Sequence, residues 1–306
     1  FDLDYNTLCG MTRAEIEATF SPELEALAVK SNATCRQVMD RLTRQYDGYR
    51  FTKDEEFTSM YNPFSVLSAL QKRSYGNYWF ASGTPTFLVE MLQKTDFDLR
   101  EMEGIEVNEA SLSDDRADIN NPIPMIYQSG YLTIKDYDER FRMYTLGFPN
   151  EEVKYGFLNF VSPFYTPIAQ TDTSFYIGKF IRELESGDVD AFLTRLRCFF
   201  AGIPYDLNDR TERHYQTVFY LVFQLMGQFT ETEVRSARGR ADAVVKTPDY
   251  IYVFEFKLND SAEAALRQID EKGYLLPYQS DGRKVVKVGV AFEKEERNIG
   301  KWVIGG

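Results

Sequence analysis

The feature that most constrains the fold is an apolar run that ends in charge. Residues 250–257 read Tyr-Ile-Tyr-Val-Phe-Glu-Phe-Lys. A run this apolar is typical of a central strand buried in a sheet. Residues 240–246 predict a neighbouring strand, and the Thr-Pro-Asp-Tyr sequence at 247–250 predicts the turn between the two strands. We therefore expect a hairpin whose apolar strand is buried and whose charged end has a functional role.

The register of this hairpin follows from its turn. If residues 247–250 form the loop, Lys246 pairs with Ile251, and the same register places Asp242 opposite Glu255. The Cβ atoms of directly paired residues lie about 5 Å apart. Lys257, two residues past Glu255, shares the face of these carboxylates. The alternative, an exposed hairpin with scattered charges, fits the apolar run poorly.

Two carboxylates that face each other on neighbouring strands are unfavourable unless something compensates their charge. Mg²⁺ characteristically binds one or two carboxylates together with waters and substrate phosphate. We predict that Asp242 and Glu255 bind Mg²⁺ or Mn²⁺. We also predict that Lys257 stabilises charge on a phosphoryl group or orients the attacking water. This arrangement is typical of metal-assisted phosphodiester hydrolysis.

The segments around the hairpin predict an α/β domain. Residues 209–228 have apolar side chains at helical spacing, and residues 261–274 predict a second helix. Residues 229–234 and 285–292 predict two further strands. The resulting order, α-β-β-β-α-β, implies an α/β sandwich on a mixed sheet.

The rest of the chain predicts a multidomain α+β protein. Residues 1–95 are expected to be helical, and Thr12 with Glu15 predicts a capping box at the first helix. Residues 96–121 are acidic and weakly periodic, which favours a linker. The helix and hairpin expected over residues 126–146 look like a winged-helix fragment. We expect three parts, with boundaries at 1–95, 96–204 and 205–306.

Composition excludes several classes of protein. A single histidine, His214, excludes metal sites built from several imidazoles, although His214 could itself be a ligand or an ordinary surface residue. The three cysteines, at positions 9, 35 and 198, form neither a zinc pattern nor a disulfide framework, and we expect free thiols in a reducing cytoplasm. No apolar run reaches the roughly 18 residues of a membrane span, and no signal peptide is visible. We therefore expect a cytoplasmic protein without a membrane partner.

The charge of the chain is unevenly distributed. Its net charge of −12 argues against a generally basic nucleic-acid coat protein. Residues 205–306 contain 15 Lys and Arg against 16 Asp and Glu, so that the remainder contains 20 against 31. This contrast between a nearly neutral last third and an acidic first two-thirds suggests two different tasks.

The residues of the hairpin resemble a known superfamily. Asp242, the Glu-Phe-Lys of 255–257 and a following helix with Gln268 resemble the PD-(D/E)XK nucleases. The stretch 212–302 looks like the branch found at the C-terminus of AAA-ATPase-like proteins common in Bacteroidetes. The motifs of that branch are Gly-Arg-x-Asp, Glu-Phe-Lys, Ala-Leu-x-Gln-Ile and Lys-Gly-Tyr, here at 239–242, 255–257, 265–269 and 272–274.

The resemblance implies a role for each matching residue. It makes Asp242 and Glu255 metal ligands and Lys257 the catalytic lysine. It places Gln268 beside the site and makes Glu212, on the first helix of the domain, an accessory acid.

Four further residues are weaker candidates for contact with nucleic acid. Arg238 and Arg240 precede Asp242 and could bind phosphates, or they could be ordinary loop charges. Lys272 and Tyr274 could bind or stack on substrate, although aromatic packing after a helix is common.

The upstream part resembles the same group of proteins. Residues 46–51, 61–64 and 77–85 look like the lid-side portion of an AAA-ATPase-like module. No GxxxxGK[ST] loop occurs in these residues, so we expect no ATPase activity from this chain and take it for a fragment of a longer protein. Arg44 or Arg50 could sense nucleotide in the intact protein or form surface salt bridges.

The sequence thus predicts an Mg²⁺- or Mn²⁺-dependent nuclease, acting on nucleic acid and preferentially on DNA. An upstream ATPase domain would regulate it. The alternative is a non-catalytic module on the nuclease fold that binds nucleic acid or a protein and regulates rather than cuts.

Overall fold

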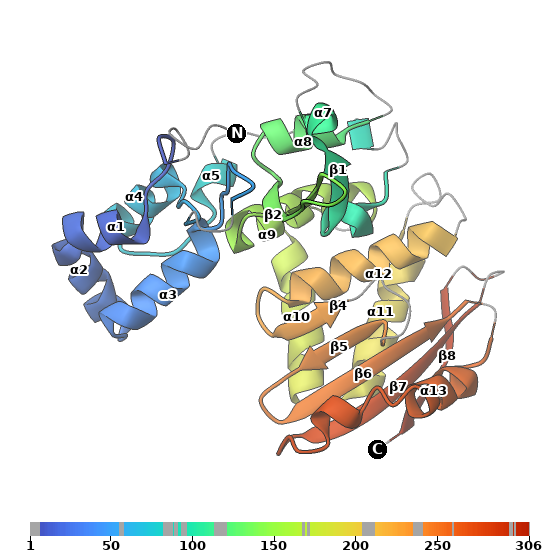
Figure 1. Ribbon diagram of the computed structural model, residues 1–306. Helices are drawn as coiled ribbons and strands as arrows, with labels where there is room; N and C mark the ends of the chain where they lie inside the picture. Colours follow the sequence, from blue (N-terminus) through green and yellow to red (C-terminus); the bar gives the residue numbers. More distant parts are fainter. Residues whose placement is uncertain are drawn as a thin grey trace. The chain divides into compact units, whose positions relative to one another are not determined.

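The structure is a computed structural model that describes residues 7–54, 58–81, 88, 91–92, 97–112, 121–166, 169, 172–203, 212–234, 241–258, 260–293, 296 and 298–305, without the side chains of 81, 212–214 and 231–234. The chain divides into two compact units, Phe1–Phe157 and Leu158–Gly306 (Figure 1). We describe each unit by itself. The three-part division expected from the sequence stays a prediction.

Helices form the first part of the N-terminal unit, and local sequence sets where they begin. The Thr12 side chain accepts a hydrogen bond from the Glu15 backbone while Glu15 accepts one from the Thr12 backbone, which confirms the predicted capping box. Asn62 accepts from the Ser65 backbone in the same way. The helices are α1 Arg13–Thr19, α2 Ser21–Ser31, α3 Cys35–Tyr46, α4 Pro63–Lys72 and the short α5 Tyr78–Ala81.

A small antiparallel sheet follows in the same unit. Helix α8 (Ile123–Gln128) leads into the hairpin of β2 (Thr133–Asp138) and β3 (Met143–Gly147), which confirms the predicted helix and hairpin. The segment 96–121, for which the sequence predicts a linker or junction, contains the strand β1 (Ile105–Asn108), which pairs with β3. This strand depends on a non-local contact, since Val107, which is buried, pairs with Tyr144 of β3. The short helices η2 Leu99–Met102 and α7 Glu109–Leu112 flank β1.

The C-terminal unit is built on a mixed sheet of five strands in the order β4-β5-β6-β7-β8 (Figure 1). Strands β6 and β7 are parallel, and the other neighbours are antiparallel. The strands are β4 Glu231–Val234, β5 Ala243–Lys246, β6 Tyr250–Lys257, β7 Lys284–Glu293 and β8 Asn298–Gly305. The order from α12 to β7 confirms the predicted α-β-β-β-α-β arrangement, and the α/β fold class is confirmed with it.

Helices of this unit cover the two faces of the sheet. The helices are α9 Glu151–Val161, which continues from the first unit, η3 Ser162–Phe164, α10 Thr173–Glu185, α11 Val189–Ala201, α12 Glu212–Met226, α13 Ala262–Glu271 and η5 Leu276–Tyr278. Side chains of β6 alternate between the faces. The ring of Phe254 makes a tilted contact with Phe192 of α11 and an edge-to-face contact with Phe223 of α12, while Val253 packs with Ile269 of α13. The sheet therefore lies between α13 and the group α11 and α12.

Two predictions about this unit need correction. The helix expected at 261–274 ends at Glu271, where α13 gives way to a turn through Gly273, whose φ is +64°. The strand β8 was not predicted at all, because Asn298–Gly305 contains two glycines and lacks a clear alternation. In the described parts of the chain, no helix is both long and apolar enough to cross a bilayer.

Candidate active site

The β5–β6 hairpin has the predicted register. Ala243 pairs with Phe254 and Lys246 with Ile251, the pairing that a loop at 247–250 requires. The Thr247 backbone N–H donates to the Tyr250 carbonyl at 2.8 Å, and the Tyr250 N–H donates to the Thr247 hydroxyl at 3.1 Å. These bonds close the turn locally.

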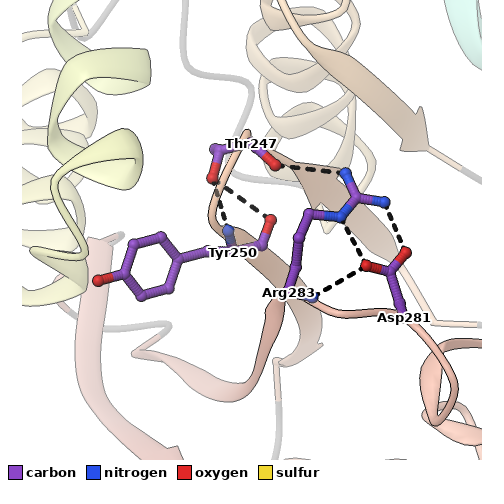
Figure 2. Close-up of polar contacts among 4 residues, drawn as sticks. All are labelled: Thr247, Tyr250, Asp281 and Arg283. Carbon is purple, nitrogen blue, oxygen red and sulfur yellow. Dashed lines mark hydrogen bonds and ion pairs between the residues drawn. The ribbon is translucent and has the colours of Figure 1, made fainter.

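A second segment holds the same turn from outside. Figure 2 shows Arg283 donating to the Thr247 carbonyl at 3.3 Å while its guanidinium is paired with Asp281 at 2.7 Å. Arginine binds a carboxylate through two parallel N–H groups, which fixes the orientation of the guanidinium. The Lys284 N–H also donates to the Asp249 carbonyl at 2.9 Å. The start of β7 therefore stabilises the turn that sets the hairpin register. Sequence reasoning did not identify this contact.

Asp242 lies just before β5, where the register places it beside the end of β6. Its Oδ2 accepts a hydrogen bond from the Phe256 backbone N–H at 2.8 Å. This bond fixes the carboxyl group across the two strands next to Glu255. The residue is half-buried.

Glu255 is the most deeply buried carboxylate of the hairpin, with 3% of its surface exposed. Its Oε1 accepts from Gln268 Nε2 and lies 3.4 Å from Lys257 Nζ. Its Oε2 is buried and has no hydrogen-bond partner among the described residues. A buried charged oxygen without a partner is costly, so it points to a group that binds there.

Lys257 and Gln268 complete the polar cluster on the α13 side of the sheet. Phe256, between Glu255 and Lys257, points to the opposite face and packs on Phe219 at a centroid distance of 4.1 Å. Gln268 accepts from Lys257 Nζ at 2.5 Å and donates to Glu255, so one amide orients both charged groups. The predicted alternation and the predicted position of Gln268 beside these residues agree with this arrangement.

Helix α13 can come this close because a glycine faces it. Gly289 of β7 pairs with Glu255, and a Cβ at Gly289 would lie 2.3 Å from the Ala262 carbonyl oxygen. Glycine inside a strand marks such a close backbone approach. The glycine interrupts the apolar run of 285–292, and this signal could have been read from the sequence.

Burial and like charge shift the pKa values of both carboxyls. Burial raises the pKa of Asp242, and the hydrogen bond from Phe256 partly offsets this effect. Burial, together with the nearby charge of Asp242, raises the pKa of Glu255 to about 7, against the opposing influence of Lys257. The pKa values of both carboxyls thus lie above their ordinary values, as burial and a neighbouring carboxylate require.

The donor set fits a divalent cation. Two carboxylates, one with an unpartnered buried oxygen, supply hard oxygen ligands of the kind that Mg²⁺ and Mn²⁺ bind alongside water and phosphate. Within the described ranges, no cluster of three or more His, Cys, Asp and Glu side chains exists. Among the described residues, Asp242 and Glu255 are therefore the carboxylates that a cation at this site would bind.

The other predicted site residues are placed less completely. Glu212 begins α12, but its side chain, like that of His214, lies outside the described residues, as do Arg238 and Arg240 entirely. Lys272 is exposed directly after α13. Tyr274 packs against a cluster that contains Ile269. The functional roles of all six stay predictions.

Comparisons with known proteins agree with the geometry. Residues 210–302 match the model of the PD-(D/E)XK nuclease superfamily. An uncharacterized protein in the vnfD 5' region of Azotobacter chroococcum mcd 1 is 31% identical over 99% of this chain, which spans only 58% of that relative. No solved structure matches the chain. These comparisons do not support the predicted association with an AAA-ATPase-like module, nor the predicted membership of the Bacteroidetes branch. Residues 210–302 are a PD-(D/E)XK nuclease superfamily domain.

Proposed function

We propose that this domain hydrolyses phosphodiester bonds of nucleic acid with the help of Mg²⁺ or Mn²⁺, and that DNA is its preferred substrate. The superfamily generally hydrolyses such bonds. The observation that carries the proposal is the buried, unpartnered Oε2 of Glu255 beside Asp242, with Lys257 on the same face.

Each residue of the cluster has a distinct role in this proposal. Asp242 and Glu255 hold the cation through their carboxylate oxygens. A divalent cation held there would supply Lewis-acid chemistry, by polarising a phosphoryl oxygen and activating water. Lys257 donates hydrogen bonds from its ammonium group and stabilises negative charge that develops on the phosphate. Gln268 holds the ammonium group in place through its carbonyl oxygen.

The regulation of this domain is a separate proposal. The sequence resemblance of 46–51, 61–64 and 77–85 suggests an upstream ATPase module that controls access to nucleic acid. The chain spans about three-fifths of its relative in Azotobacter chroococcum, so the activity of the whole protein is also a proposal.

Metal binding tests the function directly. Mn²⁺ is titrated by calorimetry, at low salt, into the wild type, Asp242→Asn and Glu255→Gln. We expect one site in the wild type that is lost in both variants. Asp270→Asn and Glu263→Gln remove exposed carboxylates of α13 and serve as matched controls that keep the site. Repeating the titration with a short duplex includes the substrate phosphate among the ligands.

Cleavage assays on DNA and RNA then test the reaction. Asp242→Asn with full metal-dependent cleavage would contradict the proposal. If the wild type bound no metal even beside the duplex, the domain would instead be a non-catalytic binding module.

A further inference from the structure

The N-terminal unit contains a cavity that the nuclease site does not use. Its volume is about 480 Å³, and small-molecule sites typically have about 300–1,000 Å³. Five aromatic side chains line it, and they come from three separate stretches of the chain: Tyr49, Phe51, Tyr61, Phe64 and Trp79. Phe51 and Phe64 are 38% and 53% exposed. Large rings left open to solvent around a cavity are typical of binding sites.

Contacts between distant segments hold these aromatic walls in place. Tyr49 forms an isolated β-bridge with Met60. At Gly130, whose φ is +79°, an added Cβ would lie 3.7 Å from the Trp79 ring and 3.8 Å from the Tyr49 ring. The glycine backbone therefore lies against both rings, and the protein itself fixes the walls.

The two amide side chains of the lining already have partners in the protein. Asn62 accepts a hydrogen bond from the Ser65 backbone N–H at 3.2 Å and is hydrogen-bonded to the Tyr49 hydroxyl. Gln128 donates to the Leu112 carbonyl at 3.3 Å. The faces of the aromatic rings are therefore the main surface that the cavity offers to a ligand.

A buried carboxylate lies behind this lining, in which no described side chain is charged. It belongs to Glu152, near the start of α9, which is 1% exposed. Its Oε1 accepts from the backbone N–H of Trp79 at 2.9 Å, and its Oε2 accepts from the Ser65 hydroxyl at 2.6 Å. These donors are neutral, and no described Lys or Arg is paired with Glu152. The ionised carboxyl is therefore hydrogen-bonded but not neutralised.

The charge of Glu152 acts on the wall of the cavity. Burial raises the pKa of the Tyr49 hydroxyl, the hydrogen bond with Asn62 opposes this shift, and the charge of Glu152 adds to it. Burial also raises the pKa of Glu152, against the hydrogen bonds that the carboxyl accepts. A positive charge in the cavity would stabilise the ionised form of Glu152.

This environment selects the charge of the ligand. The face of an aromatic ring has a negative electrostatic potential, and cages of several rings bind ammonium groups through it. The ring faces and Glu152 both repel an anion, and a neutral apolar ligand gains nothing from the carboxylate. A compact organic cation is attracted by both.

We propose that this cavity binds a small organic cation with an ammonium head, whose charge lies among the aromatic rings and is attracted by Glu152. The site is separate from the proposed nuclease function. Its test measures binding and needs no cleavage, so either proposal can fail without the other.

A matched pair of probes separates charge from shape. Choline is compared with the alcohol in which carbon replaces its quaternary nitrogen, so that the two ligands share a shape and only choline is charged. Both are titrated by calorimetry into the wild-type chain at pH 8, which favours the ionised form of Glu152. In Trp302→Phe, Trp79 is the sole indole, and its fluorescence reports independently on the cavity. We expect saturable binding of choline and much weaker binding of the neutral alcohol.

Two variants test the charge and the rings. Glu152→Gln keeps an acceptor for the Trp79 N–H and removes the charge. At an effective dielectric constant of about 20, a charge about 12 Å away contributes about tenfold to affinity, so we expect choline to bind about tenfold more weakly. Phe64→Leu keeps apolar bulk without the ring, and we expect a loss of about two- to fivefold for choline. Neither variant should weaken binding of the neutral alcohol to the same extent.

Glu151→Gln and Phe141→Leu are matched controls. Glu151 is next to Glu152 but more exposed, so solvent screens its charge. Phe141 is a 63% exposed ring of the same unit that does not line the cavity. Both controls should leave the affinity for choline within about twofold.

Three outcomes would overturn the proposal: no binding of choline, equal affinity for choline and the neutral alcohol, or indifference of choline binding to Glu152→Gln and Phe64→Leu. Binding of the neutral alcohol by Glu152→Gln shows that this variant keeps the cavity. If Glu152→Gln does not fold, Phe64→Leu, at an exposed ring, provides the test.

Discussion

At the scale of single residues, Glu255 shows why a buried carboxylate can indicate a function. One of its oxygens is satisfied by Gln268 and Lys257, while the other is buried without a described partner. A residue kept only for stability would not be left in this state, because an apolar side chain would fill the same space at lower cost. A cation would supply the interaction that this buried oxygen lacks among the described residues.

The raised pKa of Glu255 predicts that the free energy of unfolding of the metal-free protein depends on pH. The pKa is about 7 in the folded state against 4.5 for an ordinary Glu, so between these values the folded state holds the proton more tightly. The free energy of unfolding therefore falls as pH rises from 4.5 to 7, by up to about 3 kcal/mol. We expect Glu255→Gln to gain stability relative to the wild type over this range in EDTA.

Chemical denaturation at pH 5 and pH 8 measures this difference. The change in relative stability between the two pH values is the test, because a constant offset from the new amide cancels. Glu263→Gln removes an exposed carboxylate and should show no gain at pH 8. Equal stability differences at both pH values would refute the shifted pKa.

Lys257 is expected to act in the reaction rather than in metal binding. Replacing Lys257 by Met removes the ammonium group that lies 3.4 Å from Glu255 and hydrogen-bonds Gln268. Loss of one group that stabilises transition-state charge costs about 100- to 1,000-fold in kcat. We expect that loss with Mn²⁺ binding retained. Lys301→Met, at an exposed lysine, is the control. Unchanged cleavage by Lys257→Met would exclude the proposed role.

At the scale of helices and strands, the sequence predicted what is encoded locally. The predicted bounds of β6 and the predicted register of β5 on β6 were correct, because residues adjacent in sequence determine both the turn at 247–250 and the alternation of the strand. Strand β1 was missed because it is defined by its pairing with the distant β3, and β8 because its own sequence has two glycines and no clear alternation.

The candidate site shows the same limit. Spacing in the hairpin was enough to bring Asp242, Glu255 and Lys257 to one face. The position of Gln268 came only from the family resemblance, because it depends on how closely α13 packs on β7. That distance is set by Gly289, a residue on neither element of the hairpin. The clamp of Arg283 on the turn is equally non-local.

The close contact between Gly289 and α13 allows a test of whether the packing of α13 on β7 positions Gln268. Gly289→Ala would place a methyl group 2.3 Å from the Ala262 carbonyl oxygen and 2.9 Å from the Leu266 nitrogen, so α13 must move. Overpacking of this kind costs about 1–3 kcal/mol. We expect lower stability together with a loss of cleavage, because Gln268 shifts away from Glu255 and Lys257.

Denaturation and cleavage assays on one preparation measure both effects. Gly282→Ala is the matched control, since an added Cβ there meets no atom within 4 Å, and it should change stability by less than about 1 kcal/mol. If Gly289→Ala folded with full stability and full activity, the packing of α13 would not control the site.

At the scale of the whole molecule, the charge distribution limits the affinity for nucleic acid. The net charge is −12, and residues 205–306 contribute only 15 cations against 16 anions. A strand of phosphates gains little from this surface unless a cation neutralises Asp242 and Glu255. The protein is therefore expected to bind nucleic acid weakly without metal, and through a few phosphate contacts with it.

Anisotropy of a labelled duplex tests this expectation, using Lys257→Met so that cleavage does not consume the probe. We expect binding in Mn²⁺ and little in EDTA. With two or three phosphate contacts, affinity should fall about 10- to 50-fold between about 50 and 200 mM salt. Asp242→Asn in the same background should weaken the metal-dependent part, while Asp270→Asn should not. An affinity that depended on neither salt concentration nor metal would show that the domain does not bind phosphates. It would favour a protein as its partner.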